Sequence, residues 1–452
     1  MQRDLTCGPV TRSMLPFALP MILGNLLQQL YNVADTLIVG RCLGPDALAA
    51  VGSSYSLMTF LTSILLGLCM GSGVYFSILF GSREEEKLRE SIFVSFVVIA
   101  AAAALLNVAV MSLTDPILHA LQIQAQIYSM TRAYVRVIFL GIPFTFLYNY
   151  FATLLRAIGN SVVPLVFLGV SAVLNIVLDL VFVLVLDRGV AGAAEATVIS
   201  QAVSAACIAL YAFRKAPQLC PRRAEMRLRR QTVGKIFSYS FLTCVQQSVM
   251  NFGILMIQGL VNSFGVDVMA AFAAAVKIDS FAYMPVQDFG NAFSTFIAQN
   301  YGAGKAERIR AGIRSAVRTA LAFCVVISVL VFAFAAPLMT IFVAPEETGI
   351  IAIGAEYLRI EGACYCGIGC LFLLYGLYRA LGRPGMSVVL TVVSLGTRVA
   401  LAYLLAPIPA IGLPGIWWAI PIGWVLADGI GLVFYLFREK RRLAEMKQMT
   451  AA

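Results

Sequence analysis

The chain has 452 residues, of which 60% are hydrophobic and 12% are charged, and its mean hydropathy is +0.87. Soluble globular domains carry about 25% charged residues, so this composition excludes a soluble globular protein and indicates a polytopic membrane protein. The net charge of +10 would suit a nucleic-acid partner, but the basic residues lie in short segments between apolar runs. We therefore expect no nucleic-acid binding.

Apolar runs long enough to cross about 30 Å of hydrocarbon as helices recur along the whole chain. There are twelve, at residues 15–39, 51–80, 91–113, 133–153, 163–186, 191–213, 236–262, 269–299, 312–336, 355–377, 386–406 and 414–437. The sequence therefore predicts an all-α polytopic membrane protein with 12 transmembrane helices and almost no chain left for a soluble domain.

The lysines and arginines predict the orientation of these helices. Most of them fall in alternate connections between the runs, above all in residues 214–235 and 438–452. The opposite side holds few: Arg41, Arg132, Arg136, Arg188 and Arg359. Because positively charged loops stay on the cytoplasmic side, we expect both termini in the cytoplasm.

The two halves of the chain resemble each other. At an offset of about 221 residues, LGPDALAA (43–50) matches FGVDVMAA (264–271), and RAIGNS (156–161) matches RALGRP (379–384) at a similar offset. Each half holds six runs, so the halves point the same way and are related by a pseudo-two-fold axis along the membrane normal. The predicted domains are an N-terminal six-helix lobe (1–213), a basic cytoplasmic linker (214–235), a C-terminal six-helix lobe (236–437) and a basic cytoplasmic tail (438–452).

An acidic residue interrupts the first run, in QQLYNVADTLIVG (28–40). An aspartate at a helix centre costs about 2.5 to 3.5 kcal/mol on insertion scales, so Asp35 should face a protein interior or a cavity. Asn175 and Asp179 are four residues apart and share one helix face, and Thr197 lies in the next run. With 1.5 Å of rise per residue, all four lie at similar depths in the outer half of the membrane. This agreement predicts a single site.

The predicted site occurs in one half only, because its repeat positions carry other residues. These are Gly253, Arg398, Ala402 and Ile420. Oxygen ligands suit a hard cation such as Na⁺, and closely spaced carboxylates also take up protons, so the site predicts binding of Na⁺ or H⁺. The alternative is a structural ion pair of the acids with Arg132 or Arg136, and Glu195 is either a peripheral member or a solvated carboxylate.

The second half has intramembrane charges of its own. Lys277, Asp279, Glu361 and Arg398 are interpreted as cross-helix ion pairs, with substrate binding as the alternative. Asp288 lies deeper, near Pro285, and is a candidate substrate contact. The single histidine, His119, and the scattered cysteines form no catalytic or metal-binding cluster, so we expect neither an enzyme nor a cofactor.

Several motifs together resemble the multidrug and toxic compound extrusion (MATE) family across essentially the whole chain. They are NVADTLIVGRCLGPDALAAVG (32–52), RAIGNS, NIVLDLVFV (175–183), GAAEATVISQ (192–201) and IAQNYGAGKAERIR (297–310). The resemblance implies two six-helix lobes, a V-shaped central cavity and export driven by inward flow of Na⁺ or H⁺. It also implies a first-lobe cation site at the matching Asp35, Asn175, Asp179 and Thr197, which would be the ligands if the ion is Na⁺.

The resemblance further implies export of amphipathic or cationic drugs across a bacterial cytoplasmic membrane, and we expect the protein to be a monomer. The candidate substrate contacts are Tyr31, Met58, Tyr148, Phe151, Gln246, Met250, Met256, Lys277, Tyr283, Met284 and Asp288. An acid that the family often carries on the seventh helix is missing, since 236–262 contains none. The alternative function is a flippase for lipid-linked oligosaccharides in the same superfamily, for which Lys277 and Arg398 would bind pyrophosphate.

Overall fold

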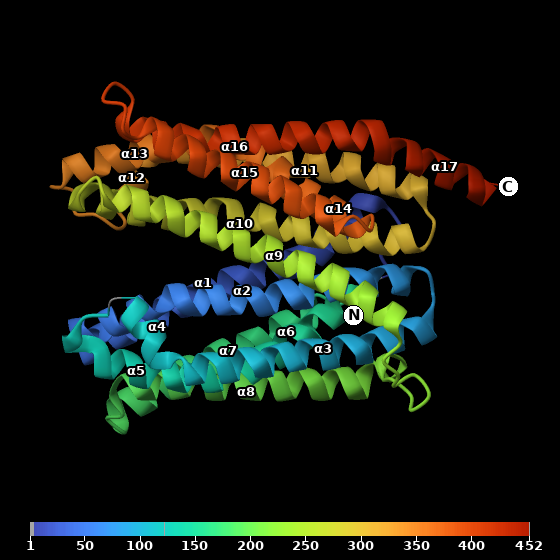
Figure 1. Cartoon of the computed structure of the whole chain (residues 1–452), viewed down its shortest axis with the longest axis horizontal. Coiled ribbons are helices and arrows are strands. Elements are labelled where there is room, and N and C mark those ends of the chain that lie inside the picture. The colour runs from blue at the N-terminus through green and yellow to red at the C-terminus, as the bar shows by residue number, and fades with distance from the viewer. Residues whose placement is uncertain (1–3, 122, 452) are drawn as a thin grey trace. The chain divides into compact units, whose positions relative to one another are not determined.

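The structure is a computed structural model that describes residues 4–121 and 123–451 (Figure 1). Over these residues the chain is helical almost throughout and contains no strand, which confirms the predicted all-α class. The first half comprises α1 (Val10–Leu43), α2 (Pro45–Gly81), α3 (Glu85–Ser112), α4 (Thr114–Ala120), α5 (Ala125–Leu140), α6 (Ile142–Ala157), α7 (Val162–Leu180), the π-helix η1 (Val181–Val185) and α8 (Gly189–Lys215).

The second half follows a short 3₁₀ turn, η2 (Pro217–Leu219), in the linker. It comprises α9 (Arg230–Asn262), α10 (Val266–Gly302), α11 (Ala306–Ala333), α12 (Ala335–Met339), α13 (Thr348–Ala363), α14 (Tyr365–Ala380), α15 (Pro384–Leu405), α16 (Gly412–Phe434), the π-helix η3 (Tyr435–Glu439) and α17 (Lys440–Ala451).

Each predicted run lies in one long helix or in one bent pair of helices. Among the described residues, nine helices are long and apolar enough to cross a membrane, and eleven spans result when the pairs α5–α6 and α13–α14, bent by 43° and 54°, are each counted once. The remaining predicted run, 269–299, corresponds to helix α10. Its 37 residues extend about 55 Å, but Lys277, Asp279 and Asp288 lower its hydropathy.

The chain forms two compact units. The first consists mainly of Leu23–Cys244, and the second of Leu5–Ile22 together with Val245–Ala452. Helices α1 and α9 are therefore divided between the units, with the division falling inside each helix rather than in a loop. In both cases the amino-terminal part of the helix belongs to the unit built mainly from the other half of the chain.

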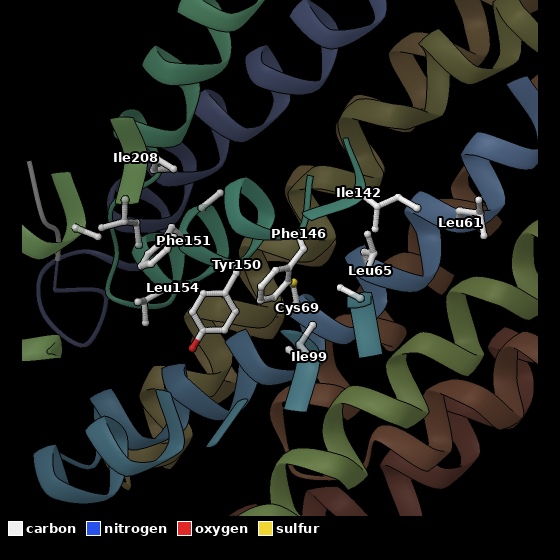
Figure 2. Close-up of a cluster of buried hydrophobic side chains, with 14 of the residues drawn as sticks. Leu61, Leu65, Cys69, Ile99, Ile142, Phe146, Tyr150, Phe151, Leu154 and Ile208 are labelled. Atoms are coloured by element: carbon white, nitrogen blue, oxygen red, sulfur yellow. The ribbon is translucent and has the colours of Figure 1, made fainter. Parts of the chain in front are cut away.

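The core of the first unit lies around α6, whose Phe146, Tyr150 and Phe151 pack against α2 and α3 (Figure 2). The rings of Phe146 and Tyr150 lie 5.7 Å apart. The hydroxyl of Tyr150 donates to the carbonyl oxygen of Ile92 in α3 at 2.6 Å, which satisfies its polar tip inside the apolar core.

Helix α1 contacts α7 in the same unit. A side chain at Gly24 would meet Leu165 and Leu168 at 3.7 and 3.6 Å, and one at Gly169 would meet Leu27 at 3.7 Å. These are ordinary van der Waals distances to the ends of leucine side chains, so α1 and α7 are in contact along this face. The packing places the acidic residue of α1 beside the polar face of α7.

Candidate functional site

The polar residues of α7 point into the first unit. Asn175 and Asp179 are 1% and 0% exposed, whereas Val173 and Val177, on the opposite face of the same helix, are 65% and 50% exposed. Residues four apart share a helix face, so one face of α7 is polar and buried while the other is apolar and exposed. This arrangement excludes a position of Asp179 in contact with lipid.

Asp35, Asn175, Asp179 and Thr197 come together, as the sequence predicts. Asn175 Nδ2 donates to Thr197 Oγ1 at 3.3 Å, and the hydroxyl of Thr197 donates to the carbonyl oxygen of Ala193 at 3.1 Å. The carboxyl groups of Asp35 and Asp179 interact electrostatically with each other. Three helices, α1, α7 and α8, thus contribute to one cluster.

Several oxygen atoms of this cluster are buried without a hydrogen-bond donor. They are Asp35 Oδ1, Asn175 Oδ1 and both carboxylate oxygens of Asp179, for which no donor is found among the described residues. Buried oxygens without a donor are costly unless a cation or a proton binds to them. Carboxylate, amide and hydroxyl oxygens are suitable ligands for Na⁺, and the paired carboxyl groups suit a shared proton.

The backbone of α7 changes just beyond Asp179. The helix continues as the π-helix η1, and the amide of Leu186 donates to the carbonyl oxygen of Val181 at 2.9 Å. Short π-helical segments are often found at functional sites because they place side chains that a regular α-helix would direct elsewhere.

The alternative ion pair of the site with Arg132 or Arg136 is not formed. Arg132 Nε and Nη2 donate to Asp115 at 2.5 and 2.9 Å, and Arg136 lies 4.0 Å from the same carboxylate. The hydrogen bond from Arg132 lowers the pKa of Asp115 to about 2. Glu195 pairs with Arg188 at 2.5 Å, away from the cluster. These acids pair with the arginines, and no salt bridge joins the candidate site to a basic side chain among the described residues.

The candidate substrate contacts of the first unit differ in their surroundings. Tyr31 interacts electrostatically with both Asp35 and Asp179, so its side chain lies near the candidate cation site. Tyr148 donates its hydroxyl to the carbonyl oxygen of Pro164 at 2.8 Å. Phe151 packs in the core and has little surface left for a substrate, whereas Met58 is half-buried at the edge of the core.

Most candidate contacts of the second unit are partly accessible. Met250, Met256, Tyr283 and Met284 are half-buried. Gln246 is buried, and no donor among the described residues reaches its Oε1 atom. Asp288 is also buried, and it is not without a partner.

The charges of the second unit do not form the two ion pairs that the sequence suggested. Lys277 is exposed and lies 5.9 Å from the ring of Phe342, and it forms no salt bridge within the described chain. Asp279 instead accepts a hydrogen bond from the hydroxyl of Tyr365 at 2.7 Å. Arg398 interacts electrostatically with both Asp279 and Glu361. The expected pairing therefore fails for Lys277, whose side chain leaves the bundle.

Sequence reasoning overlooked Asp428 in α16. Its Oδ1 atom is buried, and no donor among the described residues reaches it. The signal was present in the sequence, because Asp428 is the single acid of the apolar segment 412–434. No group of three or more His, Cys, Asp or Glu side chains in the described residues could hold a metal ion.

Comparisons with known proteins agree with this architecture. The family model MatE matches residues 20–181 and again residues 242–404, which are the two halves of the repeat. The probable multidrug resistance protein YpnP of Bacillus subtilis is 29% identical over 392 residues, which cover 86% of this chain and 87% of that protein. The multidrug export protein MepA of Staphylococcus saprophyticus is 25% identical over 440 residues, covering 95% of each chain.

The fold is also similar to solved structures. A crystal structure of MATE in the bent conformation superposes with a TM-score of 0.91 at 22% identity and covers 99% of this chain and 98% of that one. The twice-matched family model and the shared fold lead to one assignment: the chain belongs to the MATE family of multidrug efflux transporters and is not an enzyme.

Proposed function

We propose that this transporter exports amphipathic or cationic drugs across a bacterial cytoplasmic membrane in exchange for inward-moving Na⁺ or H⁺. It would act as a monomer with both termini in the cytoplasm. The relatives named for multidrug resistance and multidrug export support the class of substrate. The cluster around Asp35 and Asp179 supports coupling to a cation.

One observation carries the coupling proposal. Asp35 and Asp179 present buried carboxylate oxygens that no donor in the described chain reaches, and the two arginines considered as their alternative partners, Arg132 and Arg136, pair with Asp115. Such oxygens favour a bound cation or proton strongly, and losing that occupant leaves two close negative charges in a buried setting. Occupancy therefore changes the local energy enough to favour one arrangement of the helices over another.

The available energy suffices for concentrative export. One positive charge that moves inward through about 100 mV releases about 2.3 kcal/mol. A tenfold gradient of the same ion adds about 1.4 kcal/mol. One or two ions per drug molecule therefore support a drug gradient on the order of a hundredfold.

Transport in proteoliposomes tests the proposal. A fluorescent cationic dye serves as the substrate, and Na⁺ and pH gradients are imposed separately. We expect dye transport under one of the two gradients and a loss of at least about tenfold in Asp35→Asn and in Asp179→Asn, because a neutral amide cannot exchange a proton or balance a cation. Asp267→Asn is the control, since Asp267 is exposed at the start of α10.

Two outcomes would contradict the proposal. Normal gradient-driven transport in both carboxylate variants would remove these residues from the coupling step. Lipid scrambling without dye transport would instead support the flippase alternative. That function requires a basic groove, and the exposed Lys277 and the acid-flanked Arg398 do not supply one among the described residues.

A further inference from the structure

The segment between α8 and α9 carries most of the charge of the linker. Residues 222–230, RRAEMRLRR, contain five arginines and one acid, Glu225. We call these residues the basic strip. It has no helix before Arg230, which begins α9, and in Figure 1 the linker lies beyond the end of α8. Because it joins two membrane-spanning helices, the basic strip must lie at the membrane surface.

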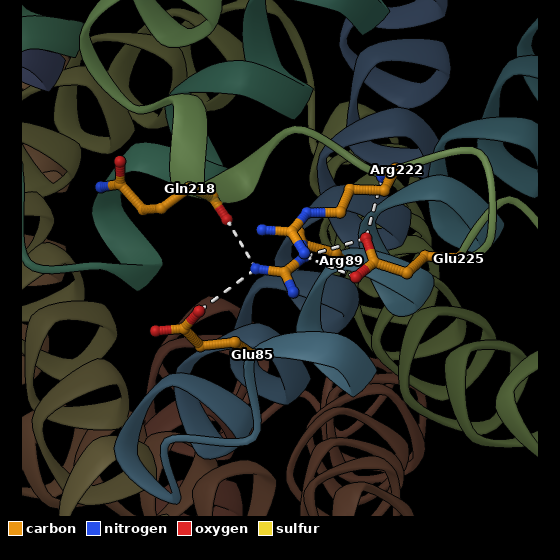
Figure 3. Close-up of polar contacts among 5 residues, drawn as sticks. All are labelled: Glu85, Arg89, Gln218, Arg222 and Glu225. Atoms are coloured by element: carbon orange, nitrogen blue, oxygen red, sulfur yellow. Dashed lines mark hydrogen bonds and ion pairs between the residues drawn. The ribbon is translucent and has the colours of Figure 1, made fainter.

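The single acid of the basic strip is already bound, so it does not neutralise the strip as a whole. Glu225 accepts hydrogen bonds from Nε of Arg89 in α3, at 2.8 Å to each carboxylate oxygen, and from the backbone N–H of Arg222 at 2.8 Å (Figure 3). Arg89 is itself buried and is also within 3.5 Å of the carbonyl oxygen of Gln218. This contact fixes the strip on the first unit.

A second contact fixes the other end of the strip. Arg229 lies 3.5 Å from Glu90 of α3, and Thr232, in the first turn of α9, donates its hydroxyl to the same carboxylate at 2.6 Å. Two ion pairs with α3 thus anchor the strip, one at Glu225 and one at Arg229, and the segment between them is held in place.

Around these two anchors the strip presents charge and apolar surface together. Arg223, Arg227 and Arg230 are exposed and form no salt bridge with any described residue. Met226 and Leu228 alternate with these arginines and are 46% and 60% exposed. A surface that faced only water would gain nothing from exposed apolar side chains, whereas the boundary between headgroups and acyl chains accommodates both kinds of group.

The flanking helices indicate the same level in the membrane. Phe213, in the last turns of α8, and Phe237, in the second turn of α9, are each 54% exposed. Both belong to the first unit, as does the strip. Exposed aromatic side chains at the ends of membrane-spanning helices suit the boundary between headgroups and acyl chains, and the unpaired arginines lie in the segment that joins these two helix ends.

We propose that the basic strip is a binding site for the phosphate headgroups of anionic phospholipids, with Arg223, Arg227 and Arg230 as the phosphate ligands and Met226 and Leu228 inserted beside the acyl chains. Clusters of arginine next to a membrane helix attract anionic lipid, and guanidinium groups bind phosphate oxygens in pairs. The anchors at Glu225 and Glu90 present the arginines outward.

The full-length protein, reconstituted in phosphatidylcholine bilayers, tests this inference. Trace spin-labelled phosphatidylglycerol or phosphatidylcholine is added, and electron paramagnetic resonance measures the fraction of each lipid immobilised by the protein. We expect a preference for phosphatidylglycerol. In a triple variant that carries Arg223→Gln, Arg227→Gln and Arg230→Gln, this preference should fall about twofold or more. Each nearby arginine strengthens association with anionic lipid up to about fivefold, but the signal averages over all lipids at the protein boundary.

The matched control replaces the same three arginines by lysine, which keeps the charge and should retain most of the preference. The preference should also fall in about 1 M NaCl, where the Debye length is about 3 Å. Equal association of the two lipids with the unaltered protein would overturn the proposal. So would an unchanged preference in the glutamine variant, which would assign lipid selection to another basic segment. Neither measurement depends on transport.

Discussion

The hydroxyl of Thr197 connects two helices at the candidate cation site. It donates to the carbonyl oxygen of Ala193 in its own helix and accepts from Asn175 Nδ2 in α7. Because its single proton is directed at the backbone, its oxygen is free to accept. The side-chain oxygen of Asn175 is then turned away from this bond and has no donor among the described residues. Thr197 therefore orients Asn175 toward the acids.

Replacing Thr197 by valine tests this orienting role. The change keeps the shape of the side chain but removes the acceptor for Asn175. We expect the half-saturating concentration of the coupling ion to rise about fivefold, which corresponds to one hydrogen bond of about 1 kcal/mol. Ion-dependent dye transport measures the effect, and Thr197→Ser, which restores the hydroxyl, is the control. Equal behaviour of the two variants would contradict an orienting hydrogen bond.

The pH dependence of stability should report on Glu225. Burial alone would raise its pKa, but the hydrogen bonds from the backbone of Arg222 and from Arg89 outweigh burial and hold the pKa below the ordinary value of 4.5. A carboxyl group with a depressed folded-state pKa stabilises the fold above its unfolded pKa. That contribution is lost as the pH falls through the folded value.

We therefore compare the thermal unfolding midpoints of the wild type and of Glu225→Gln across pH. The variant should unfold at lower temperature by a constant difference above about pH 5.5, and the difference should shrink below about pH 4.5. Glu86→Gln, at an exposed position of α3, should show no such difference. A difference that stays constant down to pH 3.5 would show that ionisation of Glu225 does not stabilise the fold.

At the scale of single residues, the sequence predicts which side chains form the candidate site, but it does not predict the partners of the arginines around it. The spacing of Asn175 and Asp179 places both on one buried face, and the structure has them there. The partner of Arg132 could not be predicted in the same way. Asp115 precedes it by 17 residues across α4, and only the turn of the chain between α3 and α5 brings the two side chains together.

At the scale of elements, glycines determine how closely α2 approaches the first part of α9. A side chain at Gly67 would lie 2.5 Å from Cα of Cys244, and one at Gly71 would lie 2.2 Å from the carbonyl oxygen of Tyr239. Ser72 and Ser240 are hydrogen-bonded at 2.7 Å beside this contact. Two glycines four residues apart thus form the small-residue interface that transmembrane helices use for close packing.

The substitution Gly71→Ala should therefore destabilise the first unit. The added methyl group would overlap the backbone of α9, which cannot rotate away, so we expect a loss of about 1 to 3 kcal/mol. Thermal unfolding in detergent, compared with Gly234→Ala, measures the effect. Gly234 is also helical, but nothing lies within 4 Å of its added carbon, so that variant should be neutral or stabilising. Equal midpoints of the two variants would contradict close packing at Gly71.

The positions of the helices follow from the sequence more fully than their partners do. Every predicted apolar run lies in a helix or a bent pair, because crossing hydrocarbon requires a fixed length of apolar chain. The contact of Gly71 with α9 was not predicted. Hydropathy does not depend on which face of a helix carries the small residues. In lipid, however, it is this face, and not the burial of apolar area, that determines which helix packs against it.

At the scale of the whole molecule, the repeat extends to the way each half begins. Residues 5–22 belong to the second unit, and residues 230–244 of α9 belong to the first. An arginine holds the segment before each of these helices. Arg89 binds Glu225, and Arg308 donates to the carbonyl oxygens of Leu5 and Cys7, at 3.0 and 2.7 Å from its Nη2 atom.

These two anchors do not occupy equivalent repeat positions. Helices α3 and α11 begin at corresponding places, but Arg89 lies in the second turn of α3 and Arg308 in the first turn of α11. The partners differ as well, since one arginine binds a carboxylate and the other binds backbone carbonyl oxygens. Sequence comparison of the halves could not reveal this shared role, because Arg89 aligns with Arg310 and not with Arg308.

A double variant that lacks both arginines tests whether the two anchors stabilise the starts of α1 and α9 independently. We expect Arg89→Gln and Arg308→Gln each to lower the free energy of unfolding by about 2 kcal/mol, because each leaves several partly buried acceptors without a charged donor. The partners of the two arginines do not overlap, so the double variant should show the sum of the single effects within about 0.5 kcal/mol. Lys87→Gln, exposed on α3, is the control. A coupling energy above about 1 kcal/mol between the two substitutions would show that the two anchors are not independent. The first parts of α1 and α9 would then not be stabilised separately.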